Sequence, residues 1–268
     1  MKPRTLPNPA PEHIEFDSRM VVKRLRQSDD MVLYSNYIND EPTFIVLMAS
    51  FDPGTALTVQ GFLDNRRALV VADRDGVVKT SEFLNTPDKK DAKKVMIPSA
   101  LAASRKLNEA GVGLAIATNQ GGYQSDEMSF VDTIATNVRV SQQLADAGGH
   151  LDAVFICPFA VGLQNPPPDV IDARKPAGGM PLYAKHLAAV SATPVLAMIG
   201  DQRTDGAAGQ AAGLKFFAVT DKNGRWEAEL EAAMRKHEEL PTLDTDPCVY
   251  REVPAFADAV GILLKDKQ

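Results

Sequence analysis

An apolar run at residues 68–72, Ala-Leu-Val-Val-Ala, ends in two carboxylates one residue apart. These are Asp73 and Asp75, and Gly76 follows them. Five consecutive apolar residues are typical of a strand that is buried on both faces in a parallel sheet. Ligands of such sheets bind beyond the carboxyl ends of the strands. Two buried carboxylates this close repel each other and need a metal ion, a proton or a cationic partner. The run therefore predicts a divalent metal ion together with acid or nucleophile chemistry.

Further apolar runs follow this one along the chain, and helical patterns separate them. The runs lie at residues 112–117, 153–157, 195–199 and 215–219. The helical patterns begin at Pro98 or cover residues 126–147, 180–190, 207–212, 226–239 and 255–264. Repeated strand–helix units predict an α/β fold, with a doubly wound parallel sheet and right-handed crossovers.

The first 66 residues differ in character from the rest. Residues 31–38 and 43–50 are β-type runs, and Asn-Asp-Glu-Pro separates them. This pattern predicts an antiparallel hairpin. We therefore divide the chain into an N-terminal β-rich accessory segment, residues 1–66, and an α/β domain, residues 67–268.

Composition narrows the classes of partner. The formal net charge is −6, which argues against a broad basic surface for nucleic acid. The longest apolar runs are well short of the roughly 18 residues that suggest a membrane span. The beginning of the sequence lacks an apolar secretory core, and two cysteines make no disulfide framework. We expect a cytoplasmic protein whose partner is a small molecule.

Four polar segments stand out, and three of them directly follow an apolar run. They are Asp73-Arg74-Asp75-Gly76, Thr118-Asn119-Gln120-Gly121-Gly122, Arg174-Lys175-Pro176 and Gly200-Asp201-Gln202-Arg203-Thr204-Asp205. If the sheet is parallel, all four converge on one edge. Three acids there, Asp73, Asp75 and Asp201, offer the oxygen ligands that Mg²⁺ prefers. The Thr118 hydroxyl and nearby backbone N–H groups can cradle phosphate oxygens, and Lys175 can neutralise a phosphoryl group during transfer.

In this order and these strand contexts, the four segments resemble the haloacid dehalogenase (HAD) superfamily of phosphohydrolases, over about residues 67–265. Within it they resemble the heptose-bisphosphate and histidinol-phosphate phosphatases. The resemblance implies a HAD-like Rossmannoid fold and Mg²⁺-dependent hydrolysis of a phosphomonoester through an aspartyl-phosphate. The substrate implied is a small phosphorylated metabolite such as a sugar phosphate. The spacing of the segments leaves no room for a large cap domain.

The resemblance also implies roles for single residues. Asp73 would be the nucleophile and a magnesium ligand. Asp75 would be the acid–base, and its backbone carbonyl would bind the metal. Thr118 and the backbone N–H of Asn119 would bind phosphate oxygens.

The remaining implied roles belong to the third and fourth segments. Lys175 would stabilise negative charge, and Arg174 would reach the substrate. Asp201 would complete the magnesium site. Asp205 would stand behind it, orienting Lys175 or a water on the metal.

One departure concerns the loop at residues 158–173. Members of the heptose-bisphosphate branch hold a structural zinc there with a Cys-x-His pair and a Cys-x-Cys pair, of which this chain keeps only Cys157. A tetrahedral structural zinc needs four ligands, so we expect none. The loop must then be held in another way, for which its prolines are candidates, and its divergence leaves the substrate open.

Two alternative functions are also considered. Polynucleotide 3′-phosphatases share this motif set and an open site, but the acidic charge balance argues against a nucleic-acid groove. A non-catalytic binding protein of the same fold would tolerate loss of Asp73, Asp75, Lys175 or Asp201, and all four are present. Residues 1–66 are candidates for a lid over the site and for a homodimer contact.

Overall fold

The computed structural model describes residues 5–17, 20–59, 62–80, 96–163, 165, 167–220 and 250–266. The helical pattern at residues 226–239 lies outside these described residues, as does Cys248. Helices and strands are assigned within these ranges.

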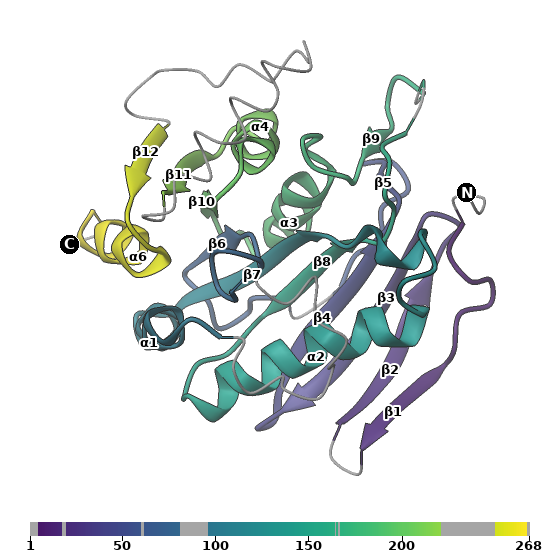
Figure 1. Cartoon of the computed structure of the whole chain (residues 1–268), viewed down its shortest axis with the longest axis horizontal. Coiled ribbons are helices and arrows are strands. Elements are labelled where there is room, and N and C mark those ends of the chain that lie inside the picture. Colours follow the sequence, from purple (N-terminus) through teal and green to yellow (C-terminus); the bar gives the residue numbers. More distant parts are fainter. Residues whose placement is uncertain are drawn as a thin grey trace.

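A single sheet forms the centre of the molecule, with the strand order β1-β2-β3-β4-β8-β7-β6-β10-β11-β12 (Figure 1). From β8 to β12 every neighbouring pair is parallel. These strands are β8 (Ala153–Cys157), β7 (Val112–Asn119), β6 (Ala68–Ala72), β10 (Val195–Gly200), β11 (Lys215–Val219) and β12 (Tyr250–Val253). The five predicted apolar strands are confirmed as the parallel part of this sheet, and β12 adds a sixth.

Helices pack against the sheet in two groups. One group is α1 (Pro98–Glu109), α2 (Phe130–Asp146) and α6 (Phe256–Lys265), in which α1 contacts both of the others. The other is α3 (Gly179–Val190) and α4 (Arg203–Ala211), which contact each other. Helices between parallel strands make this the predicted doubly wound α/β fold. None of the helices in the described ranges is long and apolar enough to cross a membrane.

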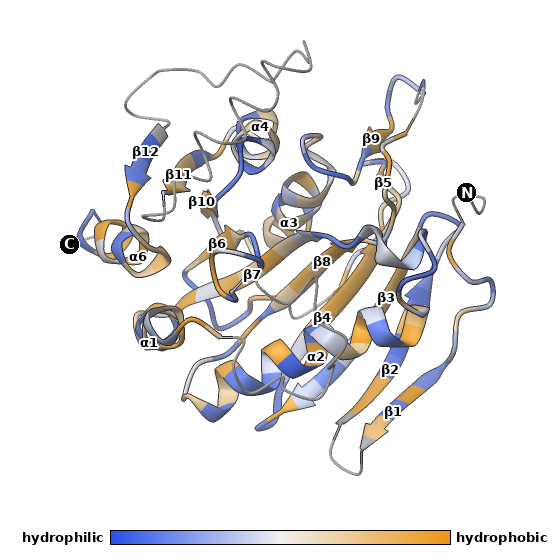
Figure 2. Ribbon diagram, in the orientation of Figure 1, coloured by the Kyte–Doolittle hydropathy of each residue, from blue (hydrophilic) through white to orange (hydrophobic). Residues whose placement is uncertain are grey.

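Burial explains why the strand sequences are continuously apolar. All residues of β6 and β8 are buried, as are the residues of β7 up to Thr118. Figure 2 shows the hydrophobic colouring concentrated in these central strands. Helices on both faces leave no side of the sheet for polar side chains, which therefore appear only where the strands end.

The N-terminal strands extend the same sheet. They are β1 (His13–Asp17), β2 (Met20–Gln27), β3 (Met31–Ile38) and β4 (Glu41–Met48), and they pair antiparallel with one another. The predicted hairpin is therefore confirmed. Asn39 and Asp40, which both have positive φ angles, form its tight turn. The second strand of the hairpin, β4, runs parallel to β8 and hydrogen-bonds with it, so the accessory strands continue the sheet of the α/β domain.

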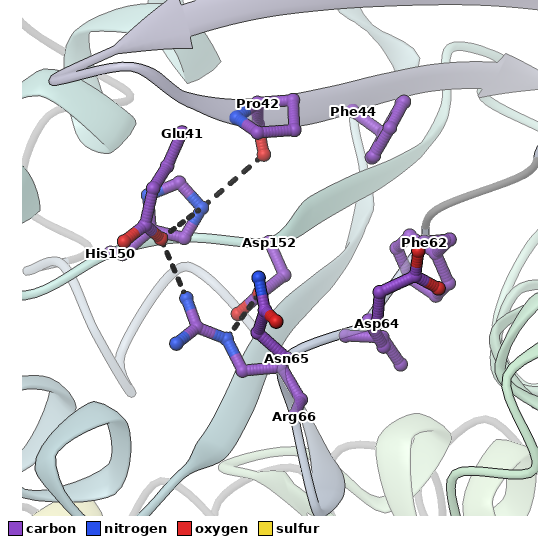
Figure 3. Close-up of a pocket in the computed structure, with 10 residues that line it drawn as sticks. Glu41, Pro42, Phe44, Phe62, Asp64, Asn65, Arg66, His150 and Asp152 are labelled. Atoms are coloured by element: carbon purple, nitrogen blue, oxygen red, sulfur yellow. Dashed lines mark hydrogen bonds and ion pairs between the residues drawn. The ribbon is translucent and has the colours of Figure 1, made fainter.

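A polar cluster fixes this junction at the amino ends of the strands (Figure 3). Arg66 Nε donates to Asp152 at 2.7 Å, and an Arg66 terminal nitrogen donates to Glu41 at 2.9 Å. His150 Nε2 lies 3.2 Å from the Pro42 carbonyl oxygen. These residues precede or begin β4, β6 and β8 and line a hollow of about 130 Å³. The cluster thus ties the N-terminal strands to the α/β domain at the edge opposite the predicted site.

Candidate active site

Sheet register brings three of the four polar segments to one edge. Ala72 at the end of β6 pairs with Ile116 of β7 and with Ile199 of β10. Asp73, Thr118 and Asp201 therefore lie one or two residues beyond the same rung of adjacent parallel strands. The convergence expected from the sequence is confirmed for these segments, because parallel strands end on the same side.

The third segment reaches this edge through Lys175, which is buried. Its ammonium nitrogen lies 2.5 Å from a carboxylate oxygen of Asp73 and 2.5 Å from one of Asp205. It also donates to the Ala117 carbonyl oxygen at 2.9 Å. An ammonium group has three N–H donors, so all three are accounted for. Lys175 thereby joins the ends of β6, β7 and the start of α4.

The electrostatics of this cluster favour a shared proton or a bound cation. Burial raises the pKa of Asp73 to about 7, and the neighbouring charges of Asp205 and Asp75 act in the same direction, while Lys175 opposes them. For Lys175, burial alone favours the neutral amine, but the carboxylates of Asp205 and Asp73 outweigh it and raise its pKa. The lysine is therefore a permanent cation, and the carboxylates still carry excess negative charge.

Three carboxylates of the site suit a divalent cation. One oxygen each from Asp73, Asp201 and Asp205 lies within 4.8 Å of the other two, and all three residues are buried. Together with Lys175 they leave a net charge of about −2, which a divalent cation would balance. Hard anionic oxygens are the ligands that Mg²⁺ prefers, so the donor set fits this ion. Asp205, which the sequence suggests only as a supporting residue, is a member of this cluster.

The backbone around Asp205 requires glycine at position 200. A Cβ atom on Gly200 would lie 2.2 Å from the Asp205 Cβ and 2.5 Å from its carboxylate. The Asp205 carboxylate also accepts the backbone N–H of Gln202 at 3.0 Å, which caps α4. The missing side chain at Gly200 and the helix cap together place the Asp205 carboxylate against Lys175.

The carboxylate of Asp75 is engaged by two cations. A terminal nitrogen of Arg74 donates to it at 2.7 Å, and Lys79 Nζ donates at 2.6 Å. Burial on its own would raise its pKa, but these two cations outweigh burial and hold the pKa of Asp75 below its usual range. Its side chain is 21% exposed, so it lies closer to solvent than that of Asp73. Lys79 is a site residue that the sequence reasoning missed, because its contact with Asp75 depends on the turn between them.

Arg74 is itself held by buried amides. Its Nη1 donates to the Asn137 side-chain oxygen at 3.2 Å, and Asn137 Nδ2 donates to Gln120 Oε1 at 2.6 Å. Gln120 belongs to the second polar segment, and Asn137 belongs to α2. These two hydrogen bonds link the first and second polar segments behind the carboxylates. No sequence pattern indicates that Arg74 and Asn137 would meet.

The second segment contributes Thr118 and Asn119 at the end of β7. Thr118 is buried beside Ile156 of β8. Asn119 Nδ2 donates to the Lys175 carbonyl at 2.9 Å, and its Oδ1 accepts the Lys175 N–H at 3.0 Å. The sequence suggests a role only for the Asn119 backbone, so this clamp on Lys175 by its side chain is an additional finding.

Arg174 lies beside Lys175 and contacts a neighbouring loop. Its Nη1 donates to the Phe159 carbonyl oxygen at 2.7 Å. Cys157 ends β8 just before this loop and is buried. The absence of a zinc ion remains a prediction from the sequence.

Comparisons with known proteins indicate the family of the chain. A family model described as HAD-hydrolase-like matches residues 172–244. The D-glycero-β-D-manno-heptose-1,7-bisphosphate 7-phosphatase of Bordetella bronchiseptica is 32% identical over 164 residues, which cover 59% of this chain and 83% of that protein. The enzyme of the same name from Rhodopseudomonas palustris is 32% identical over 154 residues, covering 57% of this chain and 83% of the relative.

Solved structures show the same fold. The D,D-heptose 1,7-bisphosphate phosphatase of B. bronchiseptica, crystallised with magnesium and phosphate, superposes with a TM-score of 0.53 at 24% identity, over 74% of this chain and 99% of that one. A putative HAD-like phosphatase from Mesorhizobium loti superposes with a TM-score of 0.51 at 24% identity, over 75% of this chain and 85% of that one.

Proposed function

Because the chain belongs to the HAD superfamily of phosphatases, in the branch of the heptose-bisphosphate phosphatases, we propose that it hydrolyses a phosphorylated sugar with Asp73 as the nucleophile. The observation that carries this proposal is the buried cluster of Asp73, Lys175, Asp201 and Asp205, in which one ammonium group faces two of three neighbouring carboxylates. A nucleophilic carboxylate beside a fixed cation and a metal-ligand set is suited to phosphoryl transfer.

In the first step a carboxylate oxygen of Asp73 attacks the phosphorus atom. A bond forms between that oxygen and phosphorus, and the bond from phosphorus to the sugar oxygen breaks. Asp75 gives a proton to the departing oxygen, which leaves as the free hydroxyl of the sugar. The product on the protein is an aspartyl-phosphate on Asp73.

In the second step Asp75, now a carboxylate, takes a proton from a water molecule. The water oxygen attacks phosphorus, and the bond to Asp73 breaks. Asp73 regains its carboxylate and inorganic phosphate leaves. The ion pairs from Asp75 to Arg74 and Lys79 favour the carboxylate, the form that this second step requires, and they oppose the protonated form that the first step requires.

Magnesium would be held by Asp73, by Asp201 and by the backbone carbonyl of Asp75, with Asp205 next to them. A bound Mg²⁺ supplies positive charge that offsets the negative charge of the phosphoryl group. Lys175, which forms an ion pair with Asp73, would supply further positive charge.

The other site residues orient the phosphate and the sugar. Thr118 and the backbone N–H of Asn119 would donate hydrogen bonds to phosphate oxygens. Asp205 would hold Lys175, which is consistent with their 2.5 Å ion pair. Arg174 would contact the sugar side of the substrate.

The relatives support a sugar phosphate as the substrate class. Both relatives described above are named for a heptose bisphosphate, whereas neither is named for a polynucleotide. The formal net charge of −6 also favours a small substrate over nucleic acid.

A phosphatase screen tests the proposal. The purified chain is assayed with Mg²⁺ on a panel of phosphorylated sugars that includes D-glycero-β-D-manno-heptose 1,7-bisphosphate, with a 3′-phosphorylated oligonucleotide in parallel. We expect turnover of one or more sugar phosphates, loss of turnover with a chelator, and loss in Asp73→Asn. Turnover of the oligonucleotide alone, or undiminished activity of Asp73→Asn, would contradict the proposal.

A further inference from the structure

We propose that Asp172 is a positioning residue through which the N-terminal strands hold the substrate side of the site, and that it thereby sets the affinity for the sugar. This inference rests on the function proposed above. It concerns the loop of residues 158–163, here called the bridging loop, and its connections to Arg174 and to the second polar segment.

The N-terminal strands reach the third polar segment directly. Just after β4, the short strand β5 (Ser50–Phe51) pairs antiparallel with β9 (Ile171–Asp172). The backbone N–H of Ala173 also donates to the Ala49 carbonyl at 3.1 Å. Thus a continuous backbone connection runs from β4 to the residue immediately before Arg174.

Packing strengthens this connection. The Phe51 ring lies 5.8 Å from the Tyr183 ring in α3, and the Tyr183 hydroxyl donates to the Leu57 carbonyl at 2.7 Å. At Gly179 a Cβ atom would lie 2.4 Å from the Asp172 carbonyl oxygen. The start of α3 therefore packs tightly against β9.

The Asp172 carboxylate joins two further segments to β9. One oxygen accepts the backbone N–H of Arg174 at 2.9 Å, and the other accepts the backbone N–H of Leu163. In both bonds an ionised carboxylate accepts from a backbone N–H group. Such hydrogen bonds are stronger than those between two neutral groups. Asp172 thereby fixes the end of the bridging loop relative to Arg174.

The bridging loop in turn contacts the second polar segment. The backbone N–H of Ala160 donates to Gln124 Oε1 at 2.8 Å. A Cβ atom on Gly121 would lie 2.8 Å from the Ala160 Cα, so the two backbones are in close contact. Since Arg174 also donates to the Phe159 carbonyl, the loop spans the gap between the second and third segments.

Lys175 is held by a separate set of contacts. Asn119 clamps its backbone, and Asp73, Asp205 and the Ala117 carbonyl hold its ammonium group. Loss of the Asp172 carboxylate would therefore loosen Arg174 and the bridging loop and leave Lys175 in place. The expected effect falls on binding of the sugar and spares phosphoryl transfer.

The experiment compares Asp172→Ala with the wild type on two substrates. p-Nitrophenyl phosphate, whose leaving group has no hydroxyls, reports the chemical machinery, and the best phosphorylated sugar of the screen reports recognition. We expect KM for the sugar phosphate to rise roughly tenfold to a hundredfold. We expect kcat for p-nitrophenyl phosphate and Mg²⁺ affinity to stay within about twofold. Asp172→Asn keeps one oxygen acceptor, so its KM for the sugar phosphate should lie between those of the wild type and Asp172→Ala.

Glu41→Ala is the matched control. It also removes a carboxylate that connects the N-terminal strands to the α/β domain, but at the opposite edge, where Glu41 faces Arg66 in the cluster of Figure 3. Its kinetic constants should match those of the wild type. Equal losses on both substrates in Asp172→Ala, or no change in either, would overturn the inference.

Hydrogen exchange provides a second readout that does not need a sugar substrate. In Asp172→Ala the amides of Leu163 and Arg174 should exchange faster, and in Glu41→Ala they should not. Unchanged exchange at both amides would overturn the inference. If the wild type hydrolyses no phosphorylated sugar, the proposed function fails on that result, and exchange still decides whether Asp172 holds the loop.

Discussion

The side chain of Asn119 makes two hydrogen bonds with the backbone of Lys175, one from Nδ2 to the carbonyl at 2.9 Å and one to Oδ1 from the N–H at 3.0 Å. This pair joins the end of β7 to a residue 56 positions further along the chain. Because the Lys175 ammonium group faces Asp73, the clamp sets the distance between a cation and the proposed nucleophile.

Replacement of Asn119 by alanine should reduce turnover. Without the clamp the Lys175 backbone can shift, and a misplacement of about 1 Å can cost on the order of a hundredfold in rate. We therefore expect Asn119→Ala to lower kcat by roughly tenfold to a hundredfold, with a smaller change in KM. Steady-state kinetics on p-nitrophenyl phosphate measures this.

Asn108→Ala is the control for that prediction. Asn108 also ties distant backbone segments together, accepting from the His150 N–H at 2.6 Å and donating to the Val112 carbonyl at 3.3 Å. Both variants should lose about 1–3 kcal/mol of stability, but only Asn119→Ala should lose activity. A similar fall in kcat for both would show that the effect is one of stability.

Magnesium affinity should depend on pH through Asp73. Burial raises the pKa of Asp73 to about 7 in the metal-free protein, so below this pH a proton competes with the ion. The apparent affinity should rise about tenfold per pH unit up to about pH 7 and level off above it. Calorimetric titrations at several pH values measure this, and an affinity that is flat with pH would contradict it.

The same pKa shift predicts the pH dependence of stability without magnesium. The folded state holds a proton on Asp73 that the unfolded state releases above its ordinary pKa of 3.8. Stability from this group is therefore present below about pH 4 and is lost as the pH rises through about 7. Added Mg²⁺ should restore it at neutral pH, and Asp73→Asn should remove the dependence.

The ion pair between Lys79 and Asp75 should oppose proton donation to the departing sugar. Lys79 helps hold the pKa of Asp75 below its usual range, and Asp75 must carry a proton to act as an acid. In Lys79→Gln the pKa of Asp75 rises, so a larger fraction of Asp75 is protonated at a given pH. The kcat for a sugar phosphate should therefore rise relative to that for p-nitrophenyl phosphate, whose leaving group needs no proton. Steady-state kinetics on both substrates measures this ratio, and an unchanged ratio would contradict the prediction.

Gly200→Ala should damage the site and the fold together. Its Cβ would collide with Asp205, and relief of such overpacking costs typically about 1–3 kcal/mol. Displacement of Asp205 would also remove an ion pair from Lys175, so activity should fall. Gly261, in helix α6, provides the contrast. A Cβ atom there meets nothing within 4 Å, so Gly261→Ala should increase stability by about 0.5–1 kcal/mol. Thermal melts and p-nitrophenyl phosphate assays on both variants test the contrast.

The positions of Asp73, Thr118 and Asp201 were predictable because each follows an apolar run. Strands buried on both faces have a distinct composition, and parallel strands end on the same side of the sheet. The hairpin at β3 and β4 was predictable from its two β-type runs and the turn residues between them. In these cases the structural signal lies within one short continuous stretch of the sequence.

Other relationships could not be predicted because they join residues far apart in the sequence. The parallel pairing of β4 with β8 brings the N-terminal strands into the main sheet, and no local pattern indicates that partner. The Asn119 clamp and the Arg74–Asn137 bond depend on which side chains the fold brings together. Asp205 was expected only in a supporting role, since its approach to Asp73 depends on the tight backbone at Gly200.

The central claim is that Asp73 carries the phosphoryl group, and acid-quenched turnover of Asp75→Asn tests it most directly. p-Nitrophenolate leaves without a proton, so this variant should still phosphorylate Asp73 and then stall, because the base for water is missing. Mass spectrometry of peptides from the quenched protein should find a phosphoryl group on Asp73, with a burst of p-nitrophenolate that matches the amount of enzyme. Steady turnover with no adduct, or an adduct on another residue, would contradict the account.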